Sequence, residues 1–250
     1  MMFGRWIVRA HKWLALAVGV QVLLWVLGGF AMSVMPLDKV RAEHTVAPGP
    51  AYQLPLADVL PAERAAAIAG LPGVEEAALV RWPDGPVWRF SSGGTVVVVD
   101  ALSGLRLPID AARAEELARA AFAGDAPVTA IEYYAEAPVE YRRDRASWRV
   151  SFDDGEGTRL YVDAATGEIG ARRNDLWRVY DVFWMLHVMD YSQRERINNP
   201  LLITASALAL LLVIAGLTLL IMRLQRTVRA ALIMRRRAQE ASRRYHGPVR

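Results

Sequence analysis

Two long uncharged apolar runs, one near each end of the chain, constrain the fold more than any other sequence feature. The first run covers Trp13–Met35 and the second covers Leu201–Met222. At a rise of 1.5 Å per residue, either run is long enough as a helix to cross a hydrocarbon core of roughly 30 Å. They also explain a hydrophobic fraction of 54%, which is high for a water-soluble chain. We therefore predict transmembrane helices within residues 1–36 and 200–222.

The charges beside the two runs predict their orientation. Arg9 and Lys12 precede the first run, whereas residues 223–250 contain nine arginines against the single acid Glu240. Because basic residues favour the cytoplasmic side, we expect a bacterial inner-membrane protein with both termini cytoplasmic and residues about 37–199 periplasmic. A cleaved signal peptide is the alternative, but an apolar run this long exceeds a typical signal sequence. The basic residues gather beside the apolar runs, which favours contact of the tail with the lipid bilayer and argues against a nucleic-acid partner.

The segment between the runs contains an internal repeat. After a Pro-rich linker over 37–55, residues 56–107 and 108–173 each show a helical pattern, three strand patterns and a turn. The helices are expected over Leu56–Ala69 and Ile109–Ala123. We predict an α+β fold in which each copy packs a three-stranded antiparallel sheet beneath its own helix. No cysteine is present, which excludes disulfides and thiolate sites.

Short motifs recur at matching places in the two copies. Trp88-Arg89 matches Trp148-Arg149, and Val99-Asp100-Ala-Leu-Ser-Gly104 matches Val162-Asp163-Ala-Ala-Thr-Gly167. An aspartate that begins such a turn accepts bonds from the amides ahead of it, and the glycine supplies a positive φ. We interpret both aspartates as turn residues. A third feature, the basic run Arg142, Arg143 and Arg145, is interpreted as a solvated charge run, with contact to anionic headgroups or a partner protein as the alternative.

These motifs carry a resemblance to a known family. A helix followed by strands that end in Val-Asp-Ala-Xaa-Thr-Gly looks like the PepSY domain. Its position between Arg9-Ala-His11-Lys-Trp13-Leu and the Leu186-His187 element resembles the PepSY-associated transmembrane family. The resemblance implies a membrane protein with two PepSY-like domains, in a family whose four-span members include haem-binding reducers of ferric siderophores. This chain has two spans rather than four, so a self-contained electron path is not implied.

Residues 174–199 form the junction between the repeat and the second span. Asn174–Met189 has the composition of an amphipathic helix, and Trp and Tyr side chains favour the headgroup level of a bilayer. Pro200 suits the first turn of the helix that follows. We expect residues of this junction to contact the membrane surface or a partner protein. They are Trp177, Tyr180, Trp184, Tyr191, Arg194 and Arg196.

Histidines are the candidate cofactor ligands, since imidazole binds haem iron well. His11 and His187 match the family motif, but the predicted topology puts them on opposite sides of the membrane, about 30 Å apart. One chain cannot then bind a single haem b with both. A haem at His187 would need a second ligand from another copy, from His44 or from another subunit. Interfacial hydrogen bonding is the alternative role for His187. His44 and His246 receive no role.

The sequence contains no recognised nucleophile, metal or nucleotide motif. The interpretation that it favours is a non-catalytic accessory or regulatory subunit of a larger redox or metal-handling membrane assembly, with other membrane-protein subunits or a second copy as partner. A haem-binding electron-transfer protein is the alternative. A PepSY module that acts like a protease inhibitor is the third.

Overall fold

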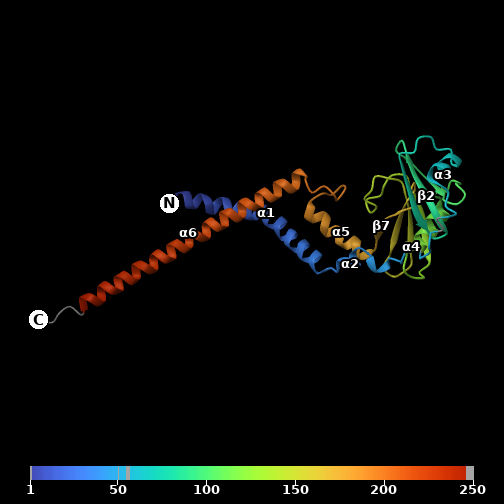
Figure 1. The fold of residues 1–250 in the computed structure, drawn as a ribbon. Coiled ribbons are helices and arrows are strands. Elements are labelled where there is room, and N and C mark those ends of the chain that lie inside the picture. The colour runs from blue at the N-terminus through green and yellow to red at the C-terminus, as the bar shows by residue number, and fades with distance from the viewer. Residues whose placement is uncertain (1, 50, 55–56, 246–250) are drawn as a thin grey trace. The chain divides into compact units, whose positions relative to one another are not determined.

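The computed structural model of the protein describes residues 2–49, 51–54 and 57–245. The chain divides into two compact units (Figure 1). The helical unit comprises Met1–Gly29, Leu186–Tyr191 and Glu195–Arg250, and the sheet unit comprises Phe30–Met185 and Ser192–Arg194. His246, Pro50, Pro55 and Leu56, which enter the sequence interpretation, lie outside the described residues. The element order of the described residues is mixed, with seven strands arranged in two antiparallel sheets, as the α+β prediction requires.

The helical unit contains most of α1 (Met2–Val34) and the whole of α6 (Pro200–Tyr245). Within the described residues, Pro200–Glu240 of α6 is the one helix long and apolar enough to cross a membrane by itself. A second span exists if the two segments of α1, Trp6–Leu16 and Val18–Val34, count as one helix bent by 53°. The prediction of two spans is therefore confirmed in part.

Helix α6 continues far beyond the predicted span. It is one helix of 46 residues and includes most of the basic tail. Asn199 caps its start, because the Asn199 side-chain oxygen accepts a 2.8 Å hydrogen bond from the backbone N–H of Leu202. Pro200 then occupies the first helical position, where the missing N–H has no cost. Arginines do not oppose helix formation, so the loss of apolar character after Met222 does not end the helix.

The first repeat of the sheet unit packs α3 (Ala62–Ile68) on a sheet of β1 (Glu76–Trp82), β2 (Gly85–Ser92) and β3 (Thr95–Asp100) in the order β1-β2-β3. Alternation along the strands produces two apolar faces. Trp88, Phe90, Val97 and Val99 pack with α3 residues such as Ala65 and Ala66. The helix is shorter than the predicted Leu56–Ala69, because it begins after Pro61.

The second repeat has one strand more than the sequence predicts. Helix α4 (Ala111–Ala121) packs on a sheet of β4 (Val128–Tyr134), β5 (Ser147–Phe152), β6 (Arg159–Asp163) and β7 (Ile169–Arg173), in chain order. The prediction of three strands is wrong for this copy. The pattern of β7, Ile-Gly-Ala-Arg-Arg, has little strand propensity, and the strand forms because its backbone pairs with β6.

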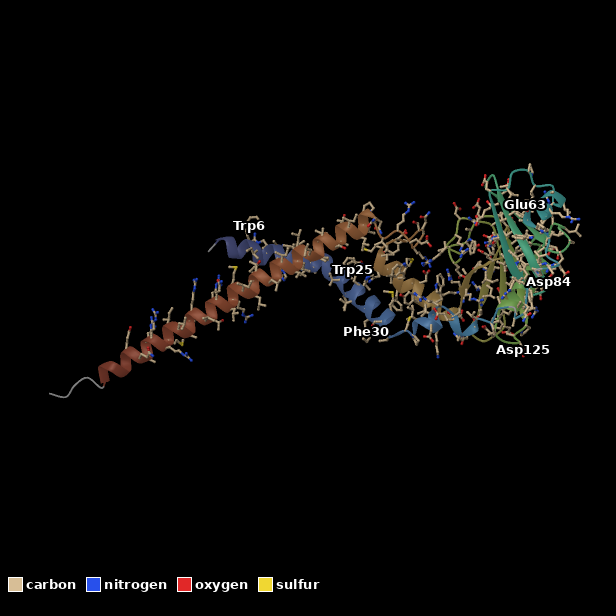
Figure 2. The ribbon with its side chains drawn as sticks, viewed as in Figure 1. Trp6, Trp25, Phe30, Glu63, Asp84 and Asp125 are labelled. Atoms are coloured by element: carbon tan, nitrogen blue, oxygen red, sulfur yellow. The ribbon has the colours of Figure 1, made fainter. Side chains whose placement is uncertain are left out.

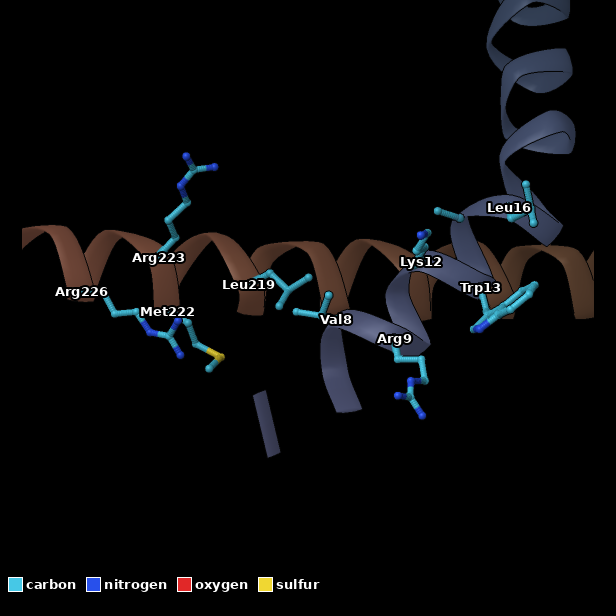
Figure 3. Close-up of a pocket in the computed structure, with 10 residues that line it drawn as sticks. Val8, Arg9, Lys12, Trp13, Leu16, Leu219, Met222, Arg223 and Arg226 are labelled. Atoms are coloured by element: carbon cyan, nitrogen blue, oxygen red, sulfur yellow. The ribbon is translucent and has the colours of Figure 1, made fainter. Parts of the chain in front are cut away.

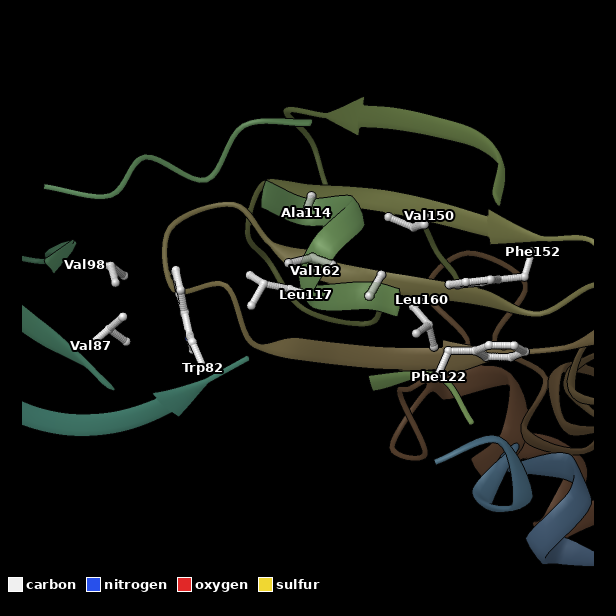
Figure 4. Close-up of a cluster of buried hydrophobic side chains, with 11 residues drawn as sticks. Trp82, Val87, Val98, Ala114, Leu117, Phe122, Val150, Phe152, Leu160 and Val162 are labelled. Atoms are coloured by element: carbon white, nitrogen blue, oxygen red, sulfur yellow. The ribbon is translucent and has the colours of Figure 1, made fainter. Parts of the chain in front are cut away.

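One apolar core joins the two repeats. It contains Trp82, Val87 and Val98 from the first sheet together with residues of α4 and the second sheet (Figure 4). Trp82 lies so close to the second repeat that a Cβ added at Gly167 would come within 2.6 Å of its ring. The first sheet thus buries both of its faces, one beneath α3 and one against the second repeat. Each copy was expected to bury one face beneath its own helix, and the first copy differs from that expectation.

The sequence repeat is also a repeat of contacts. The indole N–H groups of Trp88 and Trp148 each donate a 2.9 Å hydrogen bond to a carbonyl two residues before the helix of their own copy, that of Leu60 and that of Ile109. The matching turns agree as well. Asp100 accepts from the N–H of Leu102 and Ser103, and Asp163 accepts from the N–H of Ala165 and Thr166. Both aspartates have the turn role that the sequence predicts.

The predicted linker is largely ordered against the sheet unit. Residues 37–45 form two short helices, α2 (Leu37–Val40) and η1 (Glu43–Thr45). Val46 then forms an antiparallel bridge with Phe122 at the end of α4. The outer surface of the unit has charged side chains, such as those of Glu63, Asp84 and Asp125 (Figure 2). Asp84 connects the copies by a 2.6 Å ion pair with Arg113 of α4.

Candidate functional site

Helix α5 (Asp175–Val188) is the element through which the chain leaves the sheet unit. Asn174 caps its first turn, since the Asn174 side-chain oxygen accepts a 2.8 Å hydrogen bond from the N–H of Trp177. The amide nitrogen of the same side chain donates a 2.8 Å bond to the carbonyl of Lys39. Asn174 is only 2% exposed. One buried side chain therefore fixes both the start of α5 and the chain that follows α1.

Trp177 packs against two guanidinium groups. The Arg173 group lies 4.3 Å from the ring centroid of Trp177, and the Arg142 group lies 5.3 Å from it. These are stacking distances for cations on an indole, the aromatic ring that binds cations best. Burial, followed by the charge of Arg142, lowers the pKa of Arg173 to about 10. Trp177 is 8% exposed, so its ring is part of the sheet unit's packing.

Asp181, one helical turn after Trp177, is almost completely buried between two arginines. Its side chain is 2% exposed, and its two carboxylate oxygens accept short hydrogen bonds, one from Arg142 and one from Arg194. Both arginines have a positive φ, 55° and 61°. A side chain in this left-handed region is uncommon and costs roughly 1–2 kcal/mol. The shared carboxylate holds two strained loops against α5.

Glu140 joins α5 to the second sheet. Its carboxylate accepts a 2.9 Å hydrogen bond from the Tyr161 hydroxyl and contacts Arg159 at 3.3 Å and Arg178 at 3.2 Å. Burial raises the pKa of Glu140, but the bond from Tyr161 and the two arginine charges outweigh it, so the pKa lies below its ordinary value. The Glu140 backbone carbonyl accepts a 2.7 Å bond from Arg173 of β7. We call the residues of this network the junction cluster: Glu140, Arg142, Arg173, Trp177, Arg178, Asp181 and Arg194.

The remaining predicted interface residues have separate environments. The indole N–H of Trp184 donates a 2.9 Å bond to the carbonyl of Arg194, which folds the loop after α5 back onto the helix. Tyr180 is half-buried, and Tyr191 is 54% exposed. The side chain of Arg196 is exposed, while its backbone N–H donates a 3.0 Å bond to Asp190. Only Trp177 and Arg194 of the predicted set belong to the junction cluster.

The two family-matching histidines lie in the helical unit and are not brought together. The ring of His187 lies 6.1 Å from the Trp25 ring, measured between centroids, and it faces Gly29. His11 faces Gly216 of α6 instead, where an added Cβ would come within 3.2 Å of the imidazole. His11 and Trp25 are separated by about 20 Å along α1. Each ring has a buried Nδ1 without a hydrogen-bond partner.

One imidazole is thus available beside Gly216 and another beside Trp25, but His11 and His187 of one chain cannot bind the same iron. A haem held at His187 would need its second ligand from another copy, from His44 or from another subunit. His44, the other candidate, bonds to Glu156 at 2.8 Å. The structure describes no group of three or more His, Cys, Asp or Glu side chains in residues 2–49, 51–54 and 57–245 that could hold a metal ion.

Several residues of the junction cluster escape prediction from sequence. Glu140 lies in the irregular segment between β4 and β5, and the basic run beside it was interpreted as solvated. Arg142 instead contacts Asp181, while Arg145 lies 3.9 Å from Asp163. The one available signal was Asp181 itself, a carboxylate within an otherwise aromatic and apolar helical face.

Comparison with known proteins identifies one family. A sequence profile described as PepSY-associated TM region matches residues 8–248, which is nearly the whole chain. The matched range includes both helices of the helical unit as well as both repeats. No curated protein and no solved structure matches the chain.

Proposed function

Because this chain belongs to the PepSY-associated transmembrane family, we propose that it is a non-catalytic accessory or regulatory subunit of a larger membrane assembly of the redox or metal-handling kind. In this proposal the sheet unit is periplasmic and binds another subunit. The protein resides in a bacterial inner membrane with both termini cytoplasmic. The topology is supported by one cavity in the helical unit, which is lined by residues near the start of α1 and by residues on both sides of the end of the apolar run of α6. The basic ends of both helices therefore lie together, as the positive-inside rule requires of two antiparallel spans.

The observation that carries the proposal is an apolar surface that is covered in one repeat and exposed in the other. In the second repeat, Leu117 of α4 packs against the turn glycine Gly167, and Trp82 of the first repeat covers both. Leu117 is only 6% exposed. In the first repeat the equivalent pair is Ile68 and Gly104, which also touch.

No counterpart of Trp82 covers the first repeat within the described residues, so Ile68 is 50% exposed. Two neighbours in the same turn region, Leu102 and Leu105, are 43% and 64% exposed. We call Ile68, Leu102 and Leu105 the end patch. A fold that buries one copy of a surface and exposes the other has a ready docking site for an apolar group of a partner protein.

A crosslinking experiment in the native membrane tests the proposal. A photoreactive amino acid replaces Leu105 in the full-length chain, and another replaces Tyr133 of β4 as a control outside the end patch, because Tyr133 is exposed to a similar degree, 53%. The proposal predicts one partner subunit crosslinked from position 105 and not from position 133. Equal crosslinking from both positions, or none from position 105, contradicts it.

Haem binding is the second candidate function, and the unpartnered Nδ1 of His187 is the observation that favours it. When bound, haem would supply one-electron transfer, and the His187 side chains of two copies would hold it. The test is the Soret absorption of the full-length protein purified from haem-replete cells. A band that disappears in His187→Ala and persists in His11→Ala supports this function, and a colourless preparation contradicts it.

A further inference from the structure

A large cavity opens between α1 and α6 where the apolar runs of both helices end. Its volume is about 1220 Å³. The residues that line it come from two short segments of the helical unit, 8–16 of α1 and 219–226 of α6. Lys12 is the last charged residue before the first apolar run, and Arg223 is the first after the second run. The cavity therefore lies at the depth where the hydrocarbon core gives way to lipid headgroups.

The lining combines positive charge with apolar surface. Four cations, Arg9, Lys12, Arg223 and Arg226, contribute to it, and no carboxylate is among the lining residues. The other lining residues are apolar: Val8, Trp13, Ala15, Leu16, Leu219 and Met222. Four like charges around one cavity repel each other unless an anion joins them.

The arrangement of the side chains suggests where the anion binds. In Figure 3, Arg9 of α1 and Arg226 of α6 extend to the same side of α6, and Arg223 extends to the other side. Val8 and Leu219 lie between the two helices in the same view. Two guanidinium groups from different helices thus border an apolar floor. Guanidinium groups are well suited to phosphate oxygens, and Trp13 has the amphipathic ring that favours the headgroup region.

We propose that this cavity is a binding site for one anionic phospholipid, whose acyl chains lie on the apolar floor and whose acidic headgroup is bound by the cations that border it, Arg9 and Arg226 among them. The volume favours a lipid over a free phosphate ion, because 1220 Å³ exceeds the usual range of about 300–1,000 Å³ for drug-sized ligands. Basic pockets between membrane helices are known sites for acidic headgroups. The inference is independent of the partner proposed for the sheet unit.

Native mass spectrometry of the full-length protein tests the site. The protein is purified in a neutral detergent, and phosphatidylglycerol or phosphatidylcholine is added. Removal of both charges in Arg9→Gln/Arg226→Gln is expected to weaken phosphatidylglycerol binding about 30-fold. The matched control is Arg235→Gln/Arg236→Gln, which removes the same charge from the part of α6 outside the cavity. Arg9→Lys/Arg226→Lys keeps the charge and should retain most of the binding.

Each outcome decides the proposal. It requires retention of phosphatidylglycerol over phosphatidylcholine, loss in the cavity variant and little change in the control. Equal loss in the two glutamine variants would mean that the tail attracts acidic lipid without a site, and would overturn it. Equal binding of both lipids, or displacement of the lipid by millimolar inorganic phosphate, would also overturn it. Helix content by circular dichroism verifies that each variant is folded, and Arg9→Lys/Arg226→Lys separates charge from packing if the glutamine variant is not.

Discussion

Removal of the Asp181 carboxylate should release α5 and the loops that contact it from the sheet unit. The carboxylate is 2% exposed and is shared by Arg142 and Arg194, whose side chains are 24% and 30% exposed. Deletion of one partner of a buried ion pair typically costs about 3–5 kcal/mol, since the remaining charge stays in a poorly solvated place. The two arginines also have positive φ, so their loops gain by relaxing once the shared contact is lost.

Hydrogen–deuterium exchange of the full-length protein, read by mass spectrometry, measures this effect locally. The unfolding of a chain with two units need not be two-state, and exchange avoids that assumption. In Asp181→Ala, amides of α5 should exchange roughly 150- to 5,000-fold faster, as a loss of about 3–5 kcal/mol implies, up to the limit that global unfolding sets. Asp181→Asn keeps an acceptor but loses the charge, and should lose about 1.5–3 kcal/mol.

Asp125→Ala is the control, because Asp125 is exposed at the surface of the same unit. A surface substitution of this kind should change local stability by no more than about 0.5 kcal/mol. If α5 exchanges in Asp181→Ala no faster than in Asp125→Ala, the carboxylate does not hold α5, and the account of the junction cluster is refuted.

Three further predictions concern the repeats. Trp88→Phe and Trp148→Phe each remove a 2.9 Å hydrogen bond from an indole N–H to a carbonyl. Chemical denaturation should show that both substitutions lower the free energy of unfolding by a similar amount, about 1–3 kcal/mol. A loss in one copy alone would contradict the equivalence of the two tryptophans. In the same assay, Gly167→Ala should lower the free energy of unfolding by about 2–5 kcal/mol and Gly155→Ala by about 1–2 kcal/mol. Both glycines have a positive φ, but only at Gly167 would an added Cβ meet other side chains. Equal losses would refute the close packing at Gly167. Burial and a nearby carboxylate raise the pKa of Tyr141 from 10.0 to about 12, so its contribution to stability is complete below pH 10 and is lost as pH rises through about 12. An ultraviolet titration compared with that of Tyr141→Phe should show this residue ionising near pH 12, and ionisation near pH 10 would contradict its burial.

Features that depend on local chemistry were predictable from the sequence. The turns at Asp100 and Asp163 form as expected, because each aspartate bonds to amides two and three residues ahead. The repeated tryptophans marked equivalent positions correctly. Pro200 begins its helix as predicted, since its ring has the φ that a first helical turn requires.

Features that depend on distant partners were not predictable. Strand β7 has a weak pattern and forms because β6 offers it backbone hydrogen bonds. The partnership of Glu140 with Arg178 joins residues that are 38 positions apart, and nothing in either local sequence specifies it. The shared core around Trp82 likewise depends on how two copies pack, which periodicity within one copy does not reveal.

The association of the sheet unit with a partner subunit is most directly tested by the mass of the native complex. The full-length protein and its Leu105→Asp variant are extracted from their own membrane into nanodiscs and weighed by mass photometry. Leu105 is 64% exposed, so the substitution should leave the fold intact while it places a charge in the end patch. We expect the parent protein in a complex of fixed stoichiometry with a second subunit, and the variant without it. A parent protein found alone, or a complex that Leu105→Asp leaves unchanged, would contradict the account.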